Sequence, residues 1–193
     1  NRPIHIISAN MHSVMNSIYA PIVLPKQIIE NDLISLYVLL SKEENEDLRN
    51  QVIQYASKNG LTYIPDTSGT NINVQIIDTD KIDITKTQYS INNSIEHEDK
   101  PVLIIMDYAF GEQAYETMDE LLKPFKCKNG KKYYLNVDSV SIMGKAGILE
   151  GGKGDIMIPS SHVFEGTADN YPFKNQLKKK MFEGCGVDVY AGA

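Results

Sequence analysis

The chain has 193 residues, of which 42% are apolar, and a formal net charge of −6. This length allows one domain with a sizeable buried core. The negative charge argues against nucleic acid or an anionic membrane as the main partner, and no apolar stretch has the length of a membrane span. We expect free thiols at Cys127 and Cys185, which show neither metal nor redox spacing, and a cytoplasmic protein.

The first part of the chain alternates apolar runs with polar stretches. Residues 4–8 are a predicted strand, and residues 9–19 are predicted to begin as a polar turn and continue as a helix. The apolar run 33–40 has the length of a strand or slightly more. Residues 43–57 carry apolar side chains at helical spacing, and Gly60 is expected to end that helix as a left-handed cap.

A polar excursion separates the next two strands. Residues 73–77 are a predicted strand, and residues 78–100 are charged and poor in apolar side chains. The spacing of Asp78, Asp80 and Asp83 does not fit a calcium-binding loop of the EF-hand type. We expect solvated turn carboxylates there.

The second part of the chain contains three more predicted strands. Residues 102–106 are a buried strand, 107–111 a turn and 112–125 an amphipathic helix. Residues 137–143 and 155–158 are predicted strands.

The last elements expected are a helix at residues 175–183 and a strand at residues 187–190. The lysines at 178–180 would form the solvated face of that helix. Because the sequence starts without Met on a strand and stops just after another, we expect it to be a fragment of a longer protein.

Strands that alternate with helices predict an α/β domain whose mainly parallel sheet is covered on both faces. Such sheets bind ligands where parallel strands end at their carboxyl edge. The turns after Ile7, Met106 and Met143 are therefore the places expected to hold a site.

One stretch, residues 141–159, is the most specific motif of the chain. It reads Ser-Ile-Met-Gly-Lys-Ala-Gly-Ile-Leu-Glu-Gly-Gly-Lys-Gly-Asp-Ile-Met-Ile-Pro. This stretch resembles the ligand-binding segment of the nucleoside phosphorylase and nucleosidase superfamily, in which a small-residue turn precedes a Gly-Asp strand. Four further stretches are similar to that superfamily in order and spacing: 6–14, 102–115, 161–173 and 186–192.

The resemblance implies a three-layer α/β/α fold over a single domain, residues 1–193, that cleaves the N-glycosidic bond of a purine nucleoside or nucleotide. It implies a homo-oligomer and neither metal nor organic cofactor, with inorganic phosphate as co-substrate if the protein is a phosphorylase. The chain has only two arginines, and Arg2 and Lys145 are the only basic residues near the expected mouth of the site. Because a phosphorylase must bind inorganic phosphate, which basic residues usually hold, we favour a nucleosidase.

The resemblance also assigns candidate site residues. His12 and Ser13 are the catalytic candidates, because Ser13 stands where related nucleosidases have the glutamate that activates water, and His12 could take over that role. The candidates for substrate binding lie in the other turns, where small residues let the backbone approach a base: Ala9, Gly111, Gly144, Lys145, Ala146, Gly147, His162, Phe164 and Glu165.

Each candidate also has a structural interpretation. His12 could cap the first helix, Lys145 could be a solvent-exposed turn lysine instead of a partner for a 5′-phosphate, and His162 could be a strand histidine. Glu112, near the second turn, could stabilise a helix dipole. The sequence ends before the ribose-binding residues and the proton-donating aspartate of the superfamily. Two alternatives therefore stay open: an inactive nucleotide-binding or regulatory module, and a doubly wound domain unrelated to nucleosides.

Overall fold

The computed structural model describes residues 2–28, 32–86, 100–147, 149–163, 166, 168 and 170–192. The chain divides into two compact units, Asn1–Gly144 and Lys145–Ala193, and each is considered by itself.

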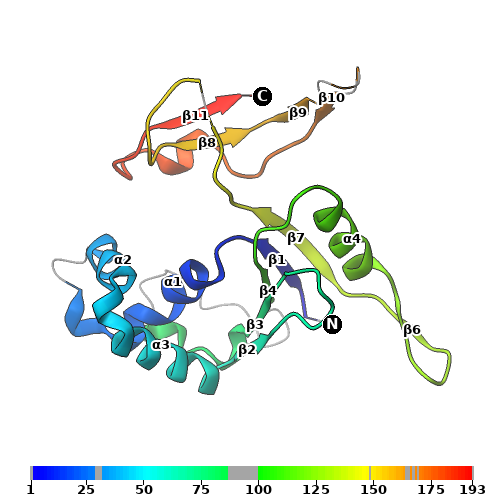
Figure 1. The fold of residues 1–193 in the computed structure, drawn as a ribbon, viewed down its shortest axis with the longest axis horizontal. Helices are drawn as coiled ribbons and strands as arrows, with labels where there is room; N and C mark the ends of the chain where they lie inside the picture. The colour runs from blue at the N-terminus through cyan, green and yellow to red at the C-terminus, as the bar shows by residue number, and fades with distance from the viewer. Residues whose placement is uncertain are drawn as a thin grey trace. The chain divides into compact units, whose positions relative to one another are not determined.

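A five-stranded mixed sheet forms the centre of the first unit, in the order β2-β3-β4-β1-β7 (Figure 1). Its strands are β1 Ile4–Ser8, β2 Leu61–Ile64, β3 Val74–Asp78, β4 Val102–Met106 and β7 Val137–Ile142. β1 runs parallel to both β4 and β7, whereas β2 and β3 form an antiparallel hairpin that pairs antiparallel with β4. The prediction of an α/β fold is confirmed, with a sheet that is parallel on one side and antiparallel on the other.

The helices of the first unit pack on its sheet through alternating strand residues. They are α1 Met11–Val23, α2 Leu33–Ser41, α3 Glu46–Lys58 and α4 Gly111–Leu122. On one face, Ile77 and Ile105 share a buried cluster with side chains of α1, α2 and α3. Ile6 and Ile104, whose side chains point the other way, cluster with Met118 and Leu121 of α4.

The second unit is a small β structure. β8 Ile156–Pro159 runs parallel to β11 Val189–Gly192, and β9 Ser161–Val163 pairs antiparallel with β10 Asn170–Pro172. Short 3₁₀ turns complete the two units at Pro25–Gln27, Glu43–Asn45, Thr79–Lys81, Ile84–Lys86 and Lys179–Phe182.

The predicted strand at residues 33–40 is wrong, because this run forms helix α2. The Asp32 carboxylate caps its first turn by accepting from Ile34 N at 2.9 Å, and Leu36 and Leu40, one helical turn apart, are buried. A continuous apolar run does not distinguish a strand from a buried helix by periodicity.

The predicted helix at residues 175–183 is also wrong, since only the 3₁₀ turn Lys179–Phe182 forms in it. The Asn175 side chain accepts from Leu177 N at 3.0 Å and donates to the Pro159 carbonyl at 3.2 Å. Such local side-chain bonds compete with helical ones.

Other ends differ by a few residues from the prediction. The strand expected at 187–190 is Val189–Gly192, and α4 stops at Leu122 because Pro124 follows its cap residue Lys123. Phe125 instead opens a hairpin of β5 Phe125–Lys126 and β6 Lys132–Tyr133.

The predicted end of α3 is confirmed. Asn59 N donates to Ala56 O at 2.9 Å, and Gly60 follows with φ of 105°. A Cβ at Gly60 would lie 2.6 Å from the Asp78 carbonyl oxygen, so the turn needs glycine for space as well as for conformation.

The described part of the excursion, residues 78–86 and 100, holds ion pairs where solvated carboxylates were expected. Asp78 contacts Arg2 at 2.7 Å, Asp80 contacts Lys100 at 3.2 Å, and Asp83 contacts Lys86 at 2.9 Å. Residues 87–99 of this prediction lie outside the described residues. In the described chain, no helix is long and apolar enough to cross a membrane.

Candidate functional site

The carboxyl ends of three parallel strands meet at one edge of the sheet. Ser8, the last residue of β1, lies in register with Met106 of β4 and Ile142 of β7. The turns that follow are also bonded, with Ala9 N donating to Met106 O at 3.1 Å and Met143 N donating to Ser8 O at 2.9 Å. The three turns that were expected to hold a site therefore begin at one edge of the sheet.

Helix α1 begins at this edge and is capped by its own sequence. The Asn10 Oδ1 atom accepts from Ser13 N at 2.9 Å and from Ser13 Oγ at 3.1 Å. Further along the helix, Tyr19 packs in the core, where it is fully buried and donates its hydroxyl to Asn59 O at 3.1 Å. Burial raises the pKa of Tyr19 far above its ordinary value, so this hydroxyl stays a neutral donor.

A cleft of about 740 Å³ lies beside the first turns of α1. Its walls come from α1, from α2 and from the turn and first half of α3, and Met143 at the end of β7 completes it. Its polar lining residues are Asn10, His12, Ser13, Asn16, Ser17, Tyr37, Ser41, Glu43, Glu46, Arg49 and Asn50. This size is within the range of small-molecule sites.

Asn16, which lines the cleft, carries an unpaired buried acceptor. Its Oδ1 atom is buried and has no partner among the described residues. Leaving a buried acceptor unsatisfied costs about 1–3 kcal/mol, and a bound donor would recover that energy.

Three groups suited to proton transfer line the same cleft. His12 is exposed, and no hydrogen bond holds its imidazole in the part of the chain that is described. The exposed Glu43 and Glu46 come from the turn before α3 and from its first residue. A histidine and carboxylates in one cavity can hold a water and take its proton.

Both arginines hold backbone carbonyls. Arg49 Nη1 donates to the carbonyls of Leu40, at 3.1 Å, and of Lys42, while Nη2 donates to Glu43 O at 3.2 Å. Arg2 lies before β1, at the opposite end of the strand from the cleft, where it donates to the Lys100 and Pro101 carbonyls and pairs with Asp78. The expectation that Arg2 lies near the mouth is wrong.

The remaining predicted residues of the first unit, Ala9, Gly111 and Gly144, do not line the cleft. Ala9 is fully buried and does not line the cleft. Gly111 opens α4 with φ of 54°. Gly144 is exposed, and a Cβ on it would meet no atom within 4 Å.

The glycine turn predicted for substrate binding crosses the boundary between the units, which falls after Gly144. Lys145, Ala146 and Gly147 are exposed in the second unit. His162 is on β9, with its ring stacked on Phe173 at a centroid distance of 5.0 Å. Phe164 and Glu165 lie outside the described residues.

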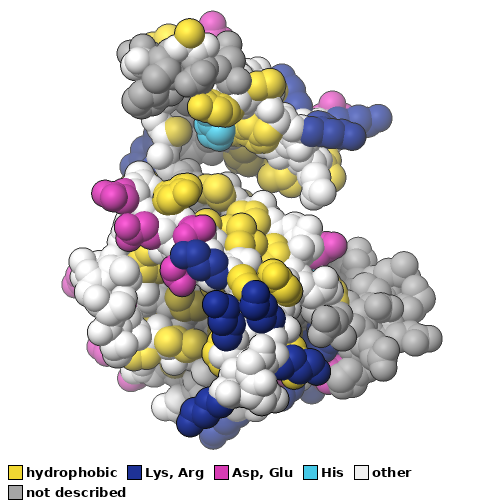
Figure 2. Space-filling view, turned by 90° about the vertical axis from the view of Figure 1, so that its right-hand side faces the viewer, with side chains coloured by type: hydrophobic (Ala, Val, Ile, Leu, Met, Phe, Trp, Pro, Cys, Tyr) yellow, Lys and Arg dark blue, Asp and Glu magenta, His cyan; other side chains and the backbone are white. Residues whose placement is uncertain are grey.

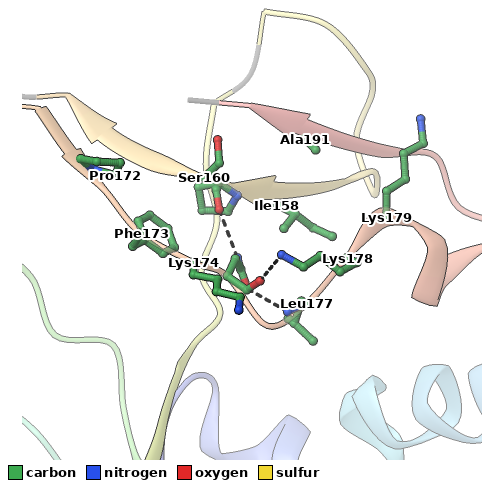
Figure 3. Close-up of a pocket in the computed structure, with 11 residues that line it drawn as sticks. Ile158, Ser160, Pro172, Phe173, Lys174, Leu177, Lys178, Lys179 and Ala191 are labelled. Atoms are coloured by element: carbon green, nitrogen blue, oxygen red, sulfur yellow. Dashed lines mark hydrogen bonds between the residues drawn. The ribbon is translucent and has the colours of Figure 1, made fainter.

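A pocket of about 570 Å³ in the second unit is bordered by two lysines of the expected last helix and by one lysine just before it (Figure 3). Lys174, Lys178 and Lys179 line it together with apolar side chains such as Phe173 and Leu177. Lys178 Nζ donates to the Asn175 carbonyl at 2.5 Å, so this ammonium helps to fix the loop.

Asn16, Glu43 and Glu46 are among the cleft residues that the sequence interpretation missed. The polar face of the helix expected at 43–57 was the available signal for the glutamates, but spacing alone does not bring it to α1. Among the described residues, no group of three or more His, Cys, Asp or Glu side chains could hold a metal ion. Cys127 and Cys185 are both free thiols, as expected.

The sequence profile of a family of unknown function, DUF6909, matches residues 33–185. The chain belongs to the DUF6909 family. The DUF6909 match includes α2 and α3, hence Glu43, Glu46 and Arg49, and begins after α1. No curated protein and no solved structure matches the chain.

Proposed function

We propose that this protein cleaves the N-glycosidic bond of a purine nucleoside or nucleotide, with water as the nucleophile. The observation that carries the proposal is the cleft beside the carboxyl edge of β1, β4 and β7, in which His12, Asn16 and Glu46 line one cavity. α/β sheets commonly bind ligands at this edge. The choice of reaction rests on the resemblance of residues 141–159 to the nucleoside phosphorylase superfamily.

A three-layer α/β/α architecture is part of the same proposal. The packing of α1, α2 and α3 on one face of the sheet and of α4 on the other supports it. The expected homo-oligomer, the cytoplasmic location, a small-molecule partner and the absence of metal and organic cofactors also belong to the proposal.

In the proposed reaction, a water oxygen bonds to C1′ of the ribose while the bond from C1′ to the base nitrogen breaks. The electron pair leaves with the base, which takes up a proton, and the products are ribose and free base. His12 or Glu46 accepts the proton of the attacking water. The carboxylates of the cleft stabilise the positive charge that develops on the sugar in the transition state.

Binding of the substrate would use Asn16. Its buried Oδ1 accepts a hydrogen bond from a sugar hydroxyl or from an amino group of the base. Because a ligand without such a donor leaves the oxygen unsatisfied, this contact discriminates among substrates.

Hydrolysis is favoured over phosphorolysis by the charge of the cleft. Glu43 and Glu46 repel a phosphate dianion, and the Arg49 guanidinium is held by three carbonyls. Water needs no anion-binding group. Lys145 remains the candidate partner for the 5′-phosphate of a nucleotide substrate.

An inactive nucleotide-binding or regulatory module is the second candidate function. One observation favours it: Ser13 stands in the position of the activating glutamate, and its hydroxyl donates to Asn10 as part of the helix cap. Such a module would bind a nucleotide without releasing its base.

The experiment is chromatographic detection of free base from adenosine, inosine, uridine, methylthioadenosine and AMP. His12→Gln and Glu46→Gln are compared with the wild type and with Lys26→Gln, which changes an exposed residue outside the cleft. Loss of the base that activates water is expected to lower kcat by about 100-fold or more in one of the two variants, with Lys26→Gln unchanged.

Binding measured by calorimetry separates the two functions. Tight binding without base release from any compound supports the inactive module. A protein that neither binds nor cleaves any of the five compounds would contradict both candidate functions.

A further inference from the structure

The hairpin of β5 and β6 is a basic, aromatic projection from an acidic protein. Residues 125–134 contain four lysines and no carboxylate, although the net charge of the chain is −6. Phe125 is 70% exposed and Tyr134 is 66% exposed. The hairpin lies at the right of Figure 1, and Lys and Arg side chains gather on that side of the molecule in Figure 2.

The pairing within this hairpin is electrostatically unfavourable. Lys126 lies directly opposite Lys132, and like charges in opposed positions of a two-stranded ribbon are destabilising. Phe125 and Tyr133 form the neighbouring pair, on the other face of the ribbon, and Lys131 lies 4.9 Å from the Tyr133 ring centroid. An acidic surface against the lysine face would remove the repulsion.

The same unit contains a groove with the complementary charge. It has a volume of about 990 Å³ and lies between α4 and the loop that joins β2 to β3. Its lining includes four carboxylates and, among the described residues, no Lys, Arg or His. The carboxylates are Asp66, Glu112, Glu116 and Glu120, and the apolar lining residues are Ile64, Pro65, Ile72, Val74 and Leu121.

Two of these carboxylates are available to a partner. Asp66 is held by donors of its own loop, and Glu120 pairs with Lys123 at 2.6 Å. Glu112 and Glu116, one helical turn apart on α4, are exposed and have no partner in the described chain. A basic segment with aromatic side chains would satisfy both the charge and the apolar lining of the groove.

We propose that the hairpin of one copy of this chain docks in the groove of a second copy. The lysine face would contact Glu112 and Glu116, and the aromatic face would cover the apolar lining. The acidic group of side chains in Figure 2 lies on the same face of the molecule as the basic group. Two patches of opposite charge on one face suit a two-fold dimer. In such a dimer, the basic patch of each copy contacts the acidic patch of the other copy.

The hairpin does not fill the groove of its own chain. Only Lys123 and Pro124 separate α4 from β5, and the groove follows α4 back towards its first turn. The exposure of Phe125 and Tyr134 confirms that neither packs there. This interface is independent of the proposed reaction, and its test does not involve activity.

The experiment is sedimentation velocity of the full chain over a range of protein and salt concentrations. The hairpin variant is Lys126→Glu with Lys132→Glu, which reverses the charge of the lysine face, and the groove variant is Glu112→Lys with Glu116→Lys. Lys26→Glu with Lys58→Glu has the same charge change as the hairpin variant at exposed positions elsewhere. Circular dichroism and thermal unfolding check that each variant is folded.

We expect a wild-type dimer that weakens with salt, and a dissociation constant raised roughly tenfold or more in each interface variant. The control variant should dimerise like the wild type. An equimolar mixture of the two interface variants should recover the dimer, because the reversed hairpin of one then faces the reversed groove of the other.

Three results overturn the proposal. A monomeric wild type does so, and would leave the lysines free for another partner such as nucleic acid. Interface variants that dimerise normally also do so. The third is a mixture that stays monomeric although both variants are folded.

Discussion

Asn16 is the residue on which the account of the cleft depends most. Its amide oxygen is buried on a helix that is otherwise held by apolar packing of Met15 and Tyr19. A structural asparagine would be expected to satisfy its oxygen within the protein. In the proposed function, the unpaired Asn16 oxygen lowers the stability of the free protein and gains a hydrogen-bond donor when the substrate binds.

Asn16→Leu should therefore stabilise the free protein and weaken substrate binding. Removing the unsatisfied oxygen is expected to raise the free energy of unfolding by about 1 kcal/mol, while KM rises about tenfold through loss of one hydrogen bond. Urea unfolding and base release measure the two effects. Asn50→Leu, at an exposed position of the same cleft, is the matched control. A destabilised variant with unchanged KM would show that Asn16 is structural.

Asp66 predicts an acid transition of the groove loop. The Ser68 hydroxyl, at 2.7 Å, is the main cause that lowers the pKa of Asp66 to about 2, and the Ser68 and Asn71 amides add to it. A carboxyl group with a depressed pKa stabilises the folded state above its unfolded pKa, here 3.8, and loses that contribution as the pH falls through about 2.

Asp66→Asn keeps an acceptor oxygen and removes this titration. We expect the wild type to be more stable than the variant above pH 4, with the difference vanishing between pH 4 and pH 2. Thermal unfolding of both proteins across this range measures it. A difference that is constant with pH would mean that the carboxylate charge contributes nothing to the loop.

The residues of the cleft differ in how far the sequence could predict them. His12 follows a predicted strand by a few residues, so the rule for carboxyl edges of sheets places it near a site. Glu46 and Asn16 reach the same cleft through the packing of α3 on α1. Such tertiary packing leaves no spacing signal in the sequence.

At the scale of elements, Arg49 joins α2 to α3. Its guanidinium contacts the carbonyls of Leu40, Lys42 and Glu43 in the last turn of α2 and the turn after it, where few carbonyls have helical partners. The arginine therefore fixes the wall of the cleft that carries Glu43 and Glu46.

Arg49→Met should destabilise the protein by about 1–3 kcal/mol, because several backbone acceptors lose their donor. Arg49→Lys should recover only part of this energy, since an ammonium cannot reproduce the fork of a guanidinium. Chemical denaturation followed by circular dichroism gives both values. Stability of Arg49→Met within about 0.5 kcal/mol of the wild type would contradict this role.

Elements with strong local signals were predictable, and those decided by packing were not. The strand at residues 102–106 and the glycine-ended helix α3 follow from periodicity and cap residues. Helix α2 was mistaken for a strand because its apolar run is continuous, and Asp32 alone indicated a helix start. In the segment 175–183, Asn175 bonds to the carbonyl of Pro159 instead of beginning a helix. No local sequence pattern reveals a contact with a residue so far away in the chain.

At the scale of the whole molecule, the candidate residues named from the sequence are divided between the two units, and each unit is tested by itself. The cleft belongs to the first unit, and the turn of Lys145, Ala146 and Gly147 opens the second.

Gly147→Val tests whether the glycine turn of the second unit contacts a ligand. A Cβ at Gly147 would meet no atom within 4 Å, so stability should stay within about 0.5 kcal/mol of the wild type. If the turn contacts a base, nucleoside affinity should fall at least about tenfold in calorimetry. Gly192→Val, equally free of close neighbours, is the control. Unchanged affinity would remove the turn from the site.

The most direct test of the central claim is base release by the wild type in phosphate-free buffer, repeated with inorganic phosphate and with identification of the sugar product. The account predicts free ribose or ribose 5-phosphate at a rate that phosphate does not change. Release that requires phosphate and yields a sugar 1-phosphate would contradict it and establish a phosphorylase.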